Sequence, residues 1–189
     1  MRETATDFIE DALSRLGRAV REHGSDLRNV QLATVSASGS PEIRTLVLRG
    51  FEWPPAQAEM HTDVRAAKAH AIAATDRVAL LAWSATERLQ LRLGGVATLH
   101  VDDTVARGRW KDLSDNARSA YGSVANPGDA IADPEDRSLL PPDIQFRQFG
   151  VLFIAVDTID VLRLGAEGRQ TRAAGRIDRD RLQAGWVAA

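Results

Sequence analysis

The stretch VQLATVSASGSPEIRTLVLRGF, Val30 to Phe51, decides the fold class. Its two halves are rich in β-branched and alternating apolar residues, which is the pattern of β-strands. Between them, Ser38-Gly39 has the composition of a tight turn, and Pro41 suits the first position of a strand. The stretch therefore predicts a strand, a turn and a second, antiparallel strand.

The second strand carries an arginine at each end of its apolar middle, Arg44 and Arg49. Both of its faces are largely apolar, so we expect one to face a barrel interior and the other a helix or a second copy of the chain, and we favour a homodimer. Each arginine needs an anionic partner, either a structural carboxylate or a bound anion, because burying its charge alone is costly. Because 44 and 49 differ by an odd number, either a bulge intervenes or the two meet different partners.

The composition is that of a globular protein with one domain, which we take to span residues 1–189. The chain has 189 residues, 44% hydrophobic and 26% charged, a formal net charge of −2 and no cysteine. The charge gives no general attraction to nucleic acid or membrane, and the lack of cysteine excludes disulfides, thiolate nucleophiles and cysteine-ligated zinc. The N-terminus lacks a secretory pattern and no apolar run approaches about 18 residues, so we expect no membrane span and a cytoplasmic location.

Helices and strands alternate along the chain. The periodicity predicts an amphipathic helix within residues 1–26, ended by Gly24, and further helices over 63–74 and 102–121. The expected N-caps of the three helices are Thr6 or Asp7, Thr62 or Asp63, and Asp102 or Asp103. Besides the opening pair, the expected strands are 58–62, 77–85, 88–101, two within 150–164, and 172–177, followed by a short segment around Trp186.

This order gives seven to eight strands in hairpin sequence, which favours an antiparallel β-barrel with flanking helices, mainly β (α+β), over a doubly wound sheet. Gly94-Gly95 interrupts one alternating strand and indicates a bulge or sharp bend. Residues 122–148 hold four prolines and few periodic apolar residues. A loop this long in a compact domain is usually functional or disordered, and we interpret it as a candidate lid.

Cations gather where the helix at residues 63–74 begins. Arg65 and Lys68 lie three residues apart and therefore on one side of its first turns. Cations are unfavourable at a helix N-terminus, which is positive already, but a phosphate would reverse the balance. With cations from a neighbouring strand they predict a cradle for a phosphate monoester; the alternative is a solvated basic face. Gln90, alone in an apolar strand, either faces solvent or reads the edge of a planar ligand.

Several signatures are absent. The sequence has no GxSxG, HExxH, P-loop or GxGxxG motif. Its histidines form no i, i+4 pair, so we expect no metal site and interpret each as a surface or hydrogen-bonded residue. They are His23, His61, His70 and His100.

Taken in order, these features resemble the pyridoxamine 5'-phosphate oxidase-like family of FMN-binding split barrels, over about Val30 to Trp186. The motifs that carry the resemblance are RTLVLRGF (Arg44 to Phe51), TDVRAAK (Thr62 to Lys68), QLRLGG (Gln90 to Gly95), and Trp110, Arg118 and Tyr121 before NPGDA. The resemblance implies a split β-barrel in which two chains build two FMN sites at their interface, with a small-molecule substrate.

The resemblance also implies roles for individual residues. Arg65 and Lys68 would hold the phosphate near Arg44, Gln90 would approach the flavin from the other subunit, and Arg49 would face the substrate together with Arg118. The cofactor contacts that it implies are Arg44, Thr45, Leu46, Val47, Arg49, Thr62, Arg65, Lys68, Gln90, Leu162 and Arg172.

The sequence departs from the family at the substrate site. Where vitamin-making members carry an Arg-x-His pair that grips pyridoxal phosphate, this chain has Gly168 and Gln170, so the resemblance gives little support to pyridoxamine phosphate oxidation. The function it implies is an FMN-dependent oxidoreductase that passes electrons to oxygen or another acceptor. The alternatives left open are a non-catalytic flavin or haem binder or carrier, with His61 as the candidate haem ligand, a deazaflavin-dependent reductase, and a structural dimer without ligand.

Overall fold

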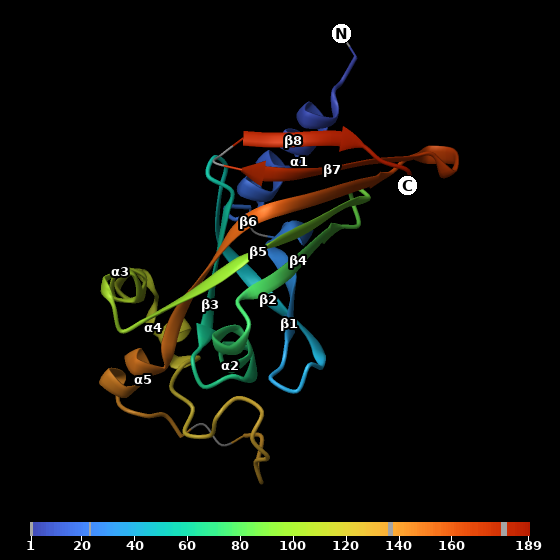
Figure 1. Ribbon diagram of the computed structural model, residues 1–189. Helices are drawn as coiled ribbons and strands as arrows, with labels where there is room; N and C mark the ends of the chain where they lie inside the picture. The colour runs from blue at the N-terminus through green and yellow to red at the C-terminus, as the bar shows by residue number, and fades with distance from the viewer. Residues whose placement is uncertain (1, 23, 136–137, 179–180) are drawn as a thin grey trace.

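The computed structural model describes residues 2–22, 24–135, 138–178 and 181–189, so His23 lies outside the described residues. Its strands form one antiparallel sheet in the order β3-β2-β1-β4-β5-β6-β7-β8, and β3 also pairs with β6. That pairing closes the six strands β1 to β6 into a barrel, while β7 and β8 continue the sheet beyond it (Figure 1). The expected split barrel, mainly β with flanking helices, is confirmed.

The described strands are β1 (Asn29–Val35), β2 (Pro41–Glu52), β3 (Gln57–Asp63), β4 (Arg77–Ser84), β5 (Leu89–Val101), β6 (Phe149–Leu164), β7 (Gln170–Asp178) and β8 (Arg181–Trp186). The described helices are α1 (Ala5–Ala19), α2 (Ala67–Ala74), α3 (Thr104–Asp112), α4 (Asp115–Ser119) and α5 (Pro142–Gln148), with 3-10 turns η1 (Asp26–Arg28) and η2 (Ala166–Gly168). Within the described part of the chain, no helix has both the length and the apolar character needed to cross a bilayer.

The hairpin expected around Ser38-Gly39 joins β1 to β2. Gly39 adopts a φ of +84°, which favours glycine, and its N–H donates to the Ser36 carbonyl (2.9 Å). Immediately outside this turn, Val35 pairs with Pro41. The turn chemistry therefore sets the register of the strands that carry Arg44.

Two irregularities bend the barrel strands. Between β2 and β3 the register shifts from Leu48 to Gly50, so Arg49 is the extra residue of a bulge. This is one of the two solutions expected for the spacing of the arginines. The second shift falls at Gly94-Gly95, as expected, and a Cβ at Gly95 would lie 2.3 Å from the Ala155 carbonyl oxygen. Only a glycine allows β5 and β6 to approach this closely.

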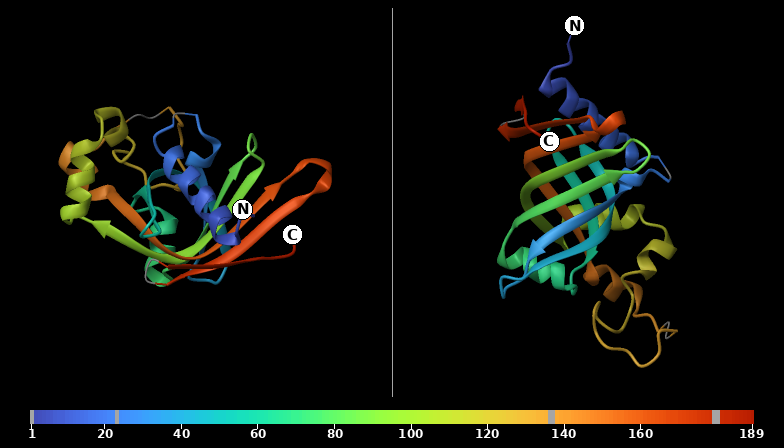
Figure 2. Two further views of the ribbon diagram at one scale, coloured as in Figure 1. Left: turned by 90° about the horizontal axis from the view of Figure 1, so that it is seen from above. Right: turned by 90° about the vertical axis from the view of Figure 1, so that its right-hand side faces the viewer.

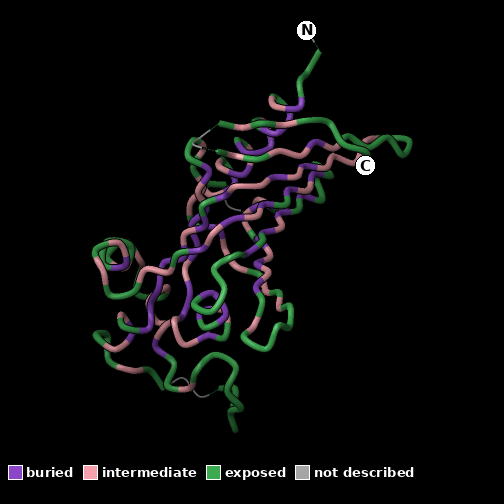
Figure 3. Tube along the Cα trace, viewed as in Figure 1, coloured by how far each residue is buried: buried purple, intermediate pink, exposed green. Residues whose placement is uncertain are grey.

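Helix α1 fills the concave side of the sheet near the projecting β7 and β8 (Figure 2). Phe8, Leu13 and Leu16 belong to its stripe of apolar side chains, are at most 1% exposed and join the main core (Figure 3). The expected cap is wrong by two or three residues. Thr4 is the N-cap and forms a capping box with Asp7, because the two side chains satisfy each other's backbone N–H groups.

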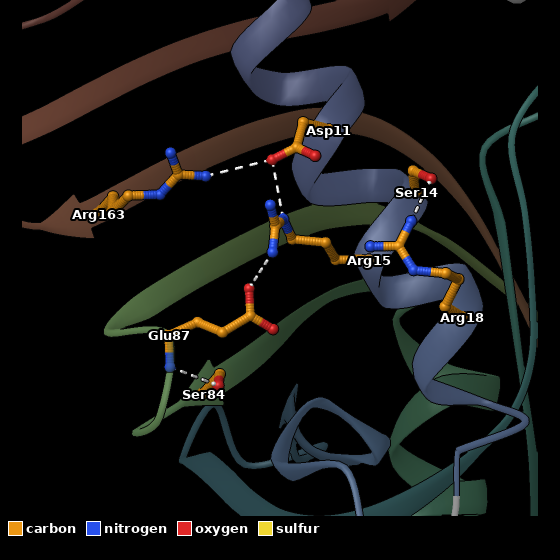
Figure 4. Close-up of polar contacts among 7 residues, drawn as sticks. All are labelled: Asp11, Ser14, Arg15, Arg18, Ser84, Glu87 and Arg163. Carbon is orange, nitrogen blue, oxygen red and sulfur yellow. Dashed lines mark hydrogen bonds and ion pairs between the residues drawn. The ribbon is translucent and has the colours of Figure 1, made fainter.

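A network of charged residues also ties α1 to the sheet (Figure 4). Asp11 accepts hydrogen bonds from Arg15 of the same helix (2.8 Å) and from Arg163 of β6 (3.2 Å), and Arg15 reaches Glu87 beyond β4. The Arg163 guanidinium lies over the Phe8 ring, 4.9 Å from its centroid. All four charged side chains are about a third exposed, so solvent screens their attraction. The network therefore helps to orient α1 on the sheet but contributes little to the free energy of folding.

Three segments differ from the sequence-based expectation. The helix expected over 102–121 breaks into α3 and α4, because the Ser114 hydroxyl accepts from Ala117 N (3.3 Å) and caps a new helix; Asp103 caps α3 as expected. The two strands expected within 150–164 are one continuous strand, β6. The long loop after α4 is shorter than expected, because residues 142–148 form α5 with Pro142 in its first turn.

Candidate cofactor site

The first turn of α2 presents backbone N–H groups that no side chain caps. Its N-cap is Ala66, which makes no side-chain hydrogen bond, and its first turn has no acidic residue. The expected caps, Thr62 and Asp63, are wrong because both belong to the end of β3; the buried Thr62 hydroxyl donates to the Asp63 carbonyl (3.1 Å). The positive end of the helix dipole is therefore open to an anion.

Lys68 adds a cation to this helix start. Burial, then repulsion from Arg44, lowers the pKa of its ammonium, while Asp63 acts in the opposite direction. The side chain is half-buried, and no other described residue accepts a hydrogen bond from it. A partly buried cation at an uncapped helix start, without an acceptor of its own, is suited to bind an anion.

Arg44 lies close enough to repel Lys68 but has partners of its own. Its guanidinium donates to the Glu42 carboxylate (2.6 Å) and to the hydroxyl of buried Thr34 (2.6 Å), with a longer contact to the Leu32 carbonyl (3.3 Å). The structural carboxylate weighed from the sequence is thus present. One partly exposed Glu42 does not neutralise two cations, so the Arg44–Lys68 pair keeps a net positive charge.

Arg65 differs from this pair of cations because its guanidinium is bonded to Asp63 and Ser123. Its Nε and Nη2 donate to the two carboxylate oxygens of Asp63 (3.0 and 2.7 Å), and its backbone N–H donates to Asp63 as well (2.8 Å). Its Nη1 donates to the Ser123 carbonyl (3.0 Å). The guanidinium is therefore fully engaged by protein acceptors.

The remaining β2 residues form the wall beside the bulge. Thr45 and Arg49 are exposed, Val47 is half-buried, and Leu46 packs against the core. Val47 and Arg49 line a surface depression of about 290 Å³ together with η1. No other described residue accepts a hydrogen bond from Arg49, which therefore offers a second free cation.

Tyr121, which follows α4, lies close enough to Arg49 for the arginine's positive charge to act on its phenol. Burial raises the pKa of its phenol to about 12, although the Arg49 charge acts to lower it. Its ring packs edge-on against Phe149 (5.0 Å between centroids) and Trp110 (6.0 Å). Tyr121 therefore stays a neutral hydroxyl at physiological pH.

A second group of expected contacts lies in one row across the sheet. Gln90 of β5 pairs with Leu162 of β6, which pairs with Arg172 of β7. Residues that pair in this way present their side chains to the same face. Arg172 is held by a bidentate contact with Asp160 (3.0 and 2.7 Å), which raises the pKa of its guanidinium.

The two groups lie on opposite faces of the sheet. Arg44 pairs with Leu32, and the same cross-strand row continues through the buried leucines Leu80 and Leu93. Gln90 is three residues from Leu93 on β5, so its side chain points to the other face. Gln90 also pairs with Trp83, at the end of β4 far from α2 (Figure 1).

The structure places Arg118 in the last turn of α4, from which its side chain reaches back to the end of α3. Its guanidinium donates to the carbonyls of Trp110 (3.2 Å) and Lys111 (3.1 Å), bonds Asp115 (3.1 Å), and lies 5.7 Å from the centre of the Trp110 ring. These contacts close the end of α3. A substrate-facing role for Arg118 stays a prediction.

A buried charge network near the site was missed by sequence reasoning. Arg109 of α3 grips both carboxylate oxygens of Glu59 (2.7 and 2.9 Å), and His61 Nε2 contacts the same carboxylate (3.2 Å). Burial would raise the pKa of Glu59, but the bonds from His61 and Arg109 outweigh it and lower the pKa to about 2. The pairing of Glu59 with Arg109 joins residues 50 apart in sequence, so no local pattern could have indicated it.

Known proteins resemble this chain in sequence and in structure. Residues 10–101 match the family model described as pyridoxamine 5'-phosphate oxidase, FMN-binding domain. A pyridoxamine 5'-phosphate oxidase-related, FMN binding protein from Nostoc punctiforme PCC 73102 is 28% identical; the match covers 95% of this chain and 96% of that one, with a TM-score of 0.78. The matched residues include the strand, helix start and Gln90 on which the sequence resemblance was based.

More distant structures share the fold. PhzG from Burkholderia lata 383, solved in complex with tetrahydrophenazine-1-carboxylic acid, is 12% identical over 100% of this chain and 94% of that one, with a TM-score of 0.75. A protein related to general stress protein 26 from Clostridium acetobutylicum is 13% identical over 91% and 99%, with a TM-score of 0.60. At these identities the likeness shows the fold alone. No curated protein sequence matches the chain.

Proposed function

We propose that this chain, which resembles the pyridoxamine 5'-phosphate oxidase family of FMN-binding domains over residues 10–101, is an FMN-dependent oxidoreductase acting on a small molecule. The observation that carries the proposal is the site of Lys68. A half-buried ammonium, repelled by Arg44, stands at an uncapped helix start and has no acceptor among the described residues. A phosphate dianion would satisfy both cations and the free N–H groups together.

The residues around Lys68 fit FMN. Lys68, Arg44 and the first N–H groups of α2 would hold its phosphate, and the β2 backbone from Thr45 to Arg49 would run beside the flavin, with Leu46 on the core side of the strand and Thr45 and Val47 on the outer side. Thr62, whose hydroxyl is buried at the end of β3, would support the phosphate end. FMN supplies hydride and electron transfer through its ring, while the protein contributes placement and charge.

The same proposal requires a homodimer. Gln90, Leu162 and Arg172 point away from the face that carries Arg44, so one chain does not present both groups to one cofactor. A second copy, related by a two-fold axis, would bring its Gln90 row to the phosphate cradle of the first and receive the reverse contact.

The outer face of the sheet supports this arrangement. Ile43 is 67% exposed and Trp83 is 37% exposed, both on the side away from α1. A depression of about 370 Å³ lies on strands β4 to β7, and its lining includes Ala79, Gly94 and Ala174. Exposed apolar side chains of this size are typical of a surface that meets another protein.

The substrate differs from pyridoxamine phosphate in this proposal. Gly168 and Gln170, which take the positions of the substrate-gripping pair, are exposed at the turn into β7 and bring no cation. Arg49 is free to bind an anionic group of another substrate. The haem alternative is weakened by His61, because its Nε2 contacts Glu59 and its ring packs edge-on against Phe149 at 5.0 Å.

The test is the visible spectrum of the purified protein, with mass analysis of what it releases on denaturation. Flavin absorption and release of FMN are the expected results. A Soret band with release of haem would favour the haem carrier instead, and release of a deazaflavin would favour the reductase alternative. A colourless protein that does not bind added FMN would contradict the proposal.

A further inference from the structure

Arg65 joins two segments far apart in the sequence. Through Nε and Nη2 it forms a bidentate pair with Asp63 at the end of β3, and through Nη1 it donates to the Ser123 carbonyl in the loop after α4. The two side chains of the pair are 18% and 9% exposed. The guanidinium is thus held between two acceptors, the Asp63 carboxylate and the Ser123 carbonyl.

Ser123 lies where the loop closes on itself. Ser123 forms an isolated β-bridge with Leu139, and Leu140 N donates to the Gly122 carbonyl (2.8 Å). The Gln145 side chain of α5 in turn donates to the Leu140 carbonyl (2.8 Å). Through Ser123, Arg65 therefore links the base of the loop to the start of α2.

Two hollows meet at Arg65. One, of about 230 Å³, lies between Asp63, Arg65 and the loop from Ser123 to Ile131. The other, of about 600 Å³, runs over the first turn of α2 beside Asn126 and Asp129. The loop thus forms a wall next to the helix start that we assign to the phosphate.

We propose that Arg65 is a positioning residue, which holds this loop as a wall of the cofactor end, and that it is not a phosphate ligand. The part that concerns the cofactor rests on the proposed function. The physical reason is that the Asp63 carboxylate depends on Arg65 for its ion pair. If Arg65 turned toward a phosphate, it would leave a nearly buried carboxylate unpaired beside an incoming dianion, and both effects are unfavourable.

The experiment measures two quantities, amide hydrogen exchange of the loop and the Kd for FMN, on the full chain. Arg65→Ala is expected to raise exchange at residues 122–131 by about tenfold or more, while the Kd changes by less than about threefold. Lys68→Ala is the matched control. It is expected to leave loop exchange unchanged and to weaken FMN binding. The proposal is wrong if Arg65→Ala weakens FMN binding as much as Lys68→Ala does and leaves loop exchange unchanged.

Arg65→Lys separates charge from geometry and covers the case in which Arg65→Ala fails to fold. Lysine keeps the charge but cannot hold Asp63 bidentately and reach Ser123 at once. We therefore expect faster loop exchange with FMN affinity retained; a loop that stays protected would overturn the proposal. If the wild-type protein binds no FMN, the proposed function fails, yet exchange of the cofactor-free variants still tests the role of Arg65.

Discussion

Lys68 of α2 and Arg44 of β2 bring two positive charges together, and their repulsion helps to lower the pKa of Lys68. Glu42 bonds Arg44, but no other described residue accepts a hydrogen bond from Lys68. An anion bound beside both cations would offset this repulsion, and this is the reason for proposing that the pair binds a ligand.

Reversing either charge should remove most FMN binding. Lys68→Glu and Arg44→Glu are each expected to weaken binding at least tenfold, or about 1.4 kcal/mol, because each puts a carboxylate beside the phosphate. Lys111→Glu, at the exposed lysine of α3, makes the same charge change elsewhere and serves as control. Titration of flavin fluorescence gives the Kd; equal affinity in all three variants would remove the cradle assignment.

FMN affinity should pass through a plateau in pH. A bound phosphate stabilises the charged ammonium, so affinity is full while Lys68 is protonated and falls as pH rises through its lowered pKa. It also falls below about pH 6, where the phosphate loses its second charge. Lys68→Ala should abolish the alkaline fall and keep the acid one. An unchanged alkaline fall would assign that titration to another group.

The buried carboxylate of Glu59 should govern stability in acid. Its pKa is lowered from 4.5 to about 2, so its contribution is present above about pH 4.5 and is lost as pH falls toward 2. Glu59→Gln should flatten the acid limb of the unfolding free energy and cost about 1–3 kcal/mol at neutral pH, since Arg109 is 45% exposed and partly screened. Glu87→Gln, at the exposed pair with Arg15, should cost less than about 1 kcal/mol. Urea unfolding against pH measures both; equal losses would show that the network adds nothing special.

A charge on the outer face should separate the subunits. Ile43→Asp is expected to give a monomer by light scattering with the fold retained, because the exposed isoleucine would meet its copy in an apolar contact. Val124→Asp changes an apolar side chain that is 59% exposed on the distant loop and should leave the oligomer intact. A wild-type monomer would already contradict the interface.

Short-range chemistry explains which parts of the fold were predictable. Ser38-Gly39 sets its own hairpin, and Gly94-Gly95 marks the register shift, because turn and bulge geometry depend on a few adjacent residues. Asp103 caps α3 for the same reason. The break at Ser114 was missed, since serine both fits a helix surface and caps a new helix.

The parts of the site that depend on tertiary contacts were not predictable. Arg65 was expected at a phosphate because it lies three residues before Lys68 at a helix start, and that role stays a prediction. Its contacts with Asp63 and Ser123 depend on the tertiary fold, so the sequence could not indicate them. The Glu59–Arg109 pair likewise exists only once α3 packs against the sheet, where it contacts β5 and β6. The residue types therefore predicted a group of cations, while the tertiary fold determines which of them are bonded to protein carboxylates and which have no protein acceptor among the described residues.

The most direct test is complementation between two damaged chains. Lys68→Glu destroys the phosphate half-site, and a double variant, Gln90→Ala with Arg172→Ala, damages the half-site on the opposite face. A heterodimer purified through two different tags would contain one intact site made from both chains, so about one FMN per dimer should bind with wild-type affinity while each parent dimer binds at least about tenfold more weakly. A heterodimer that binds no better than its parents would show that the two groups of residues do not share a cofactor.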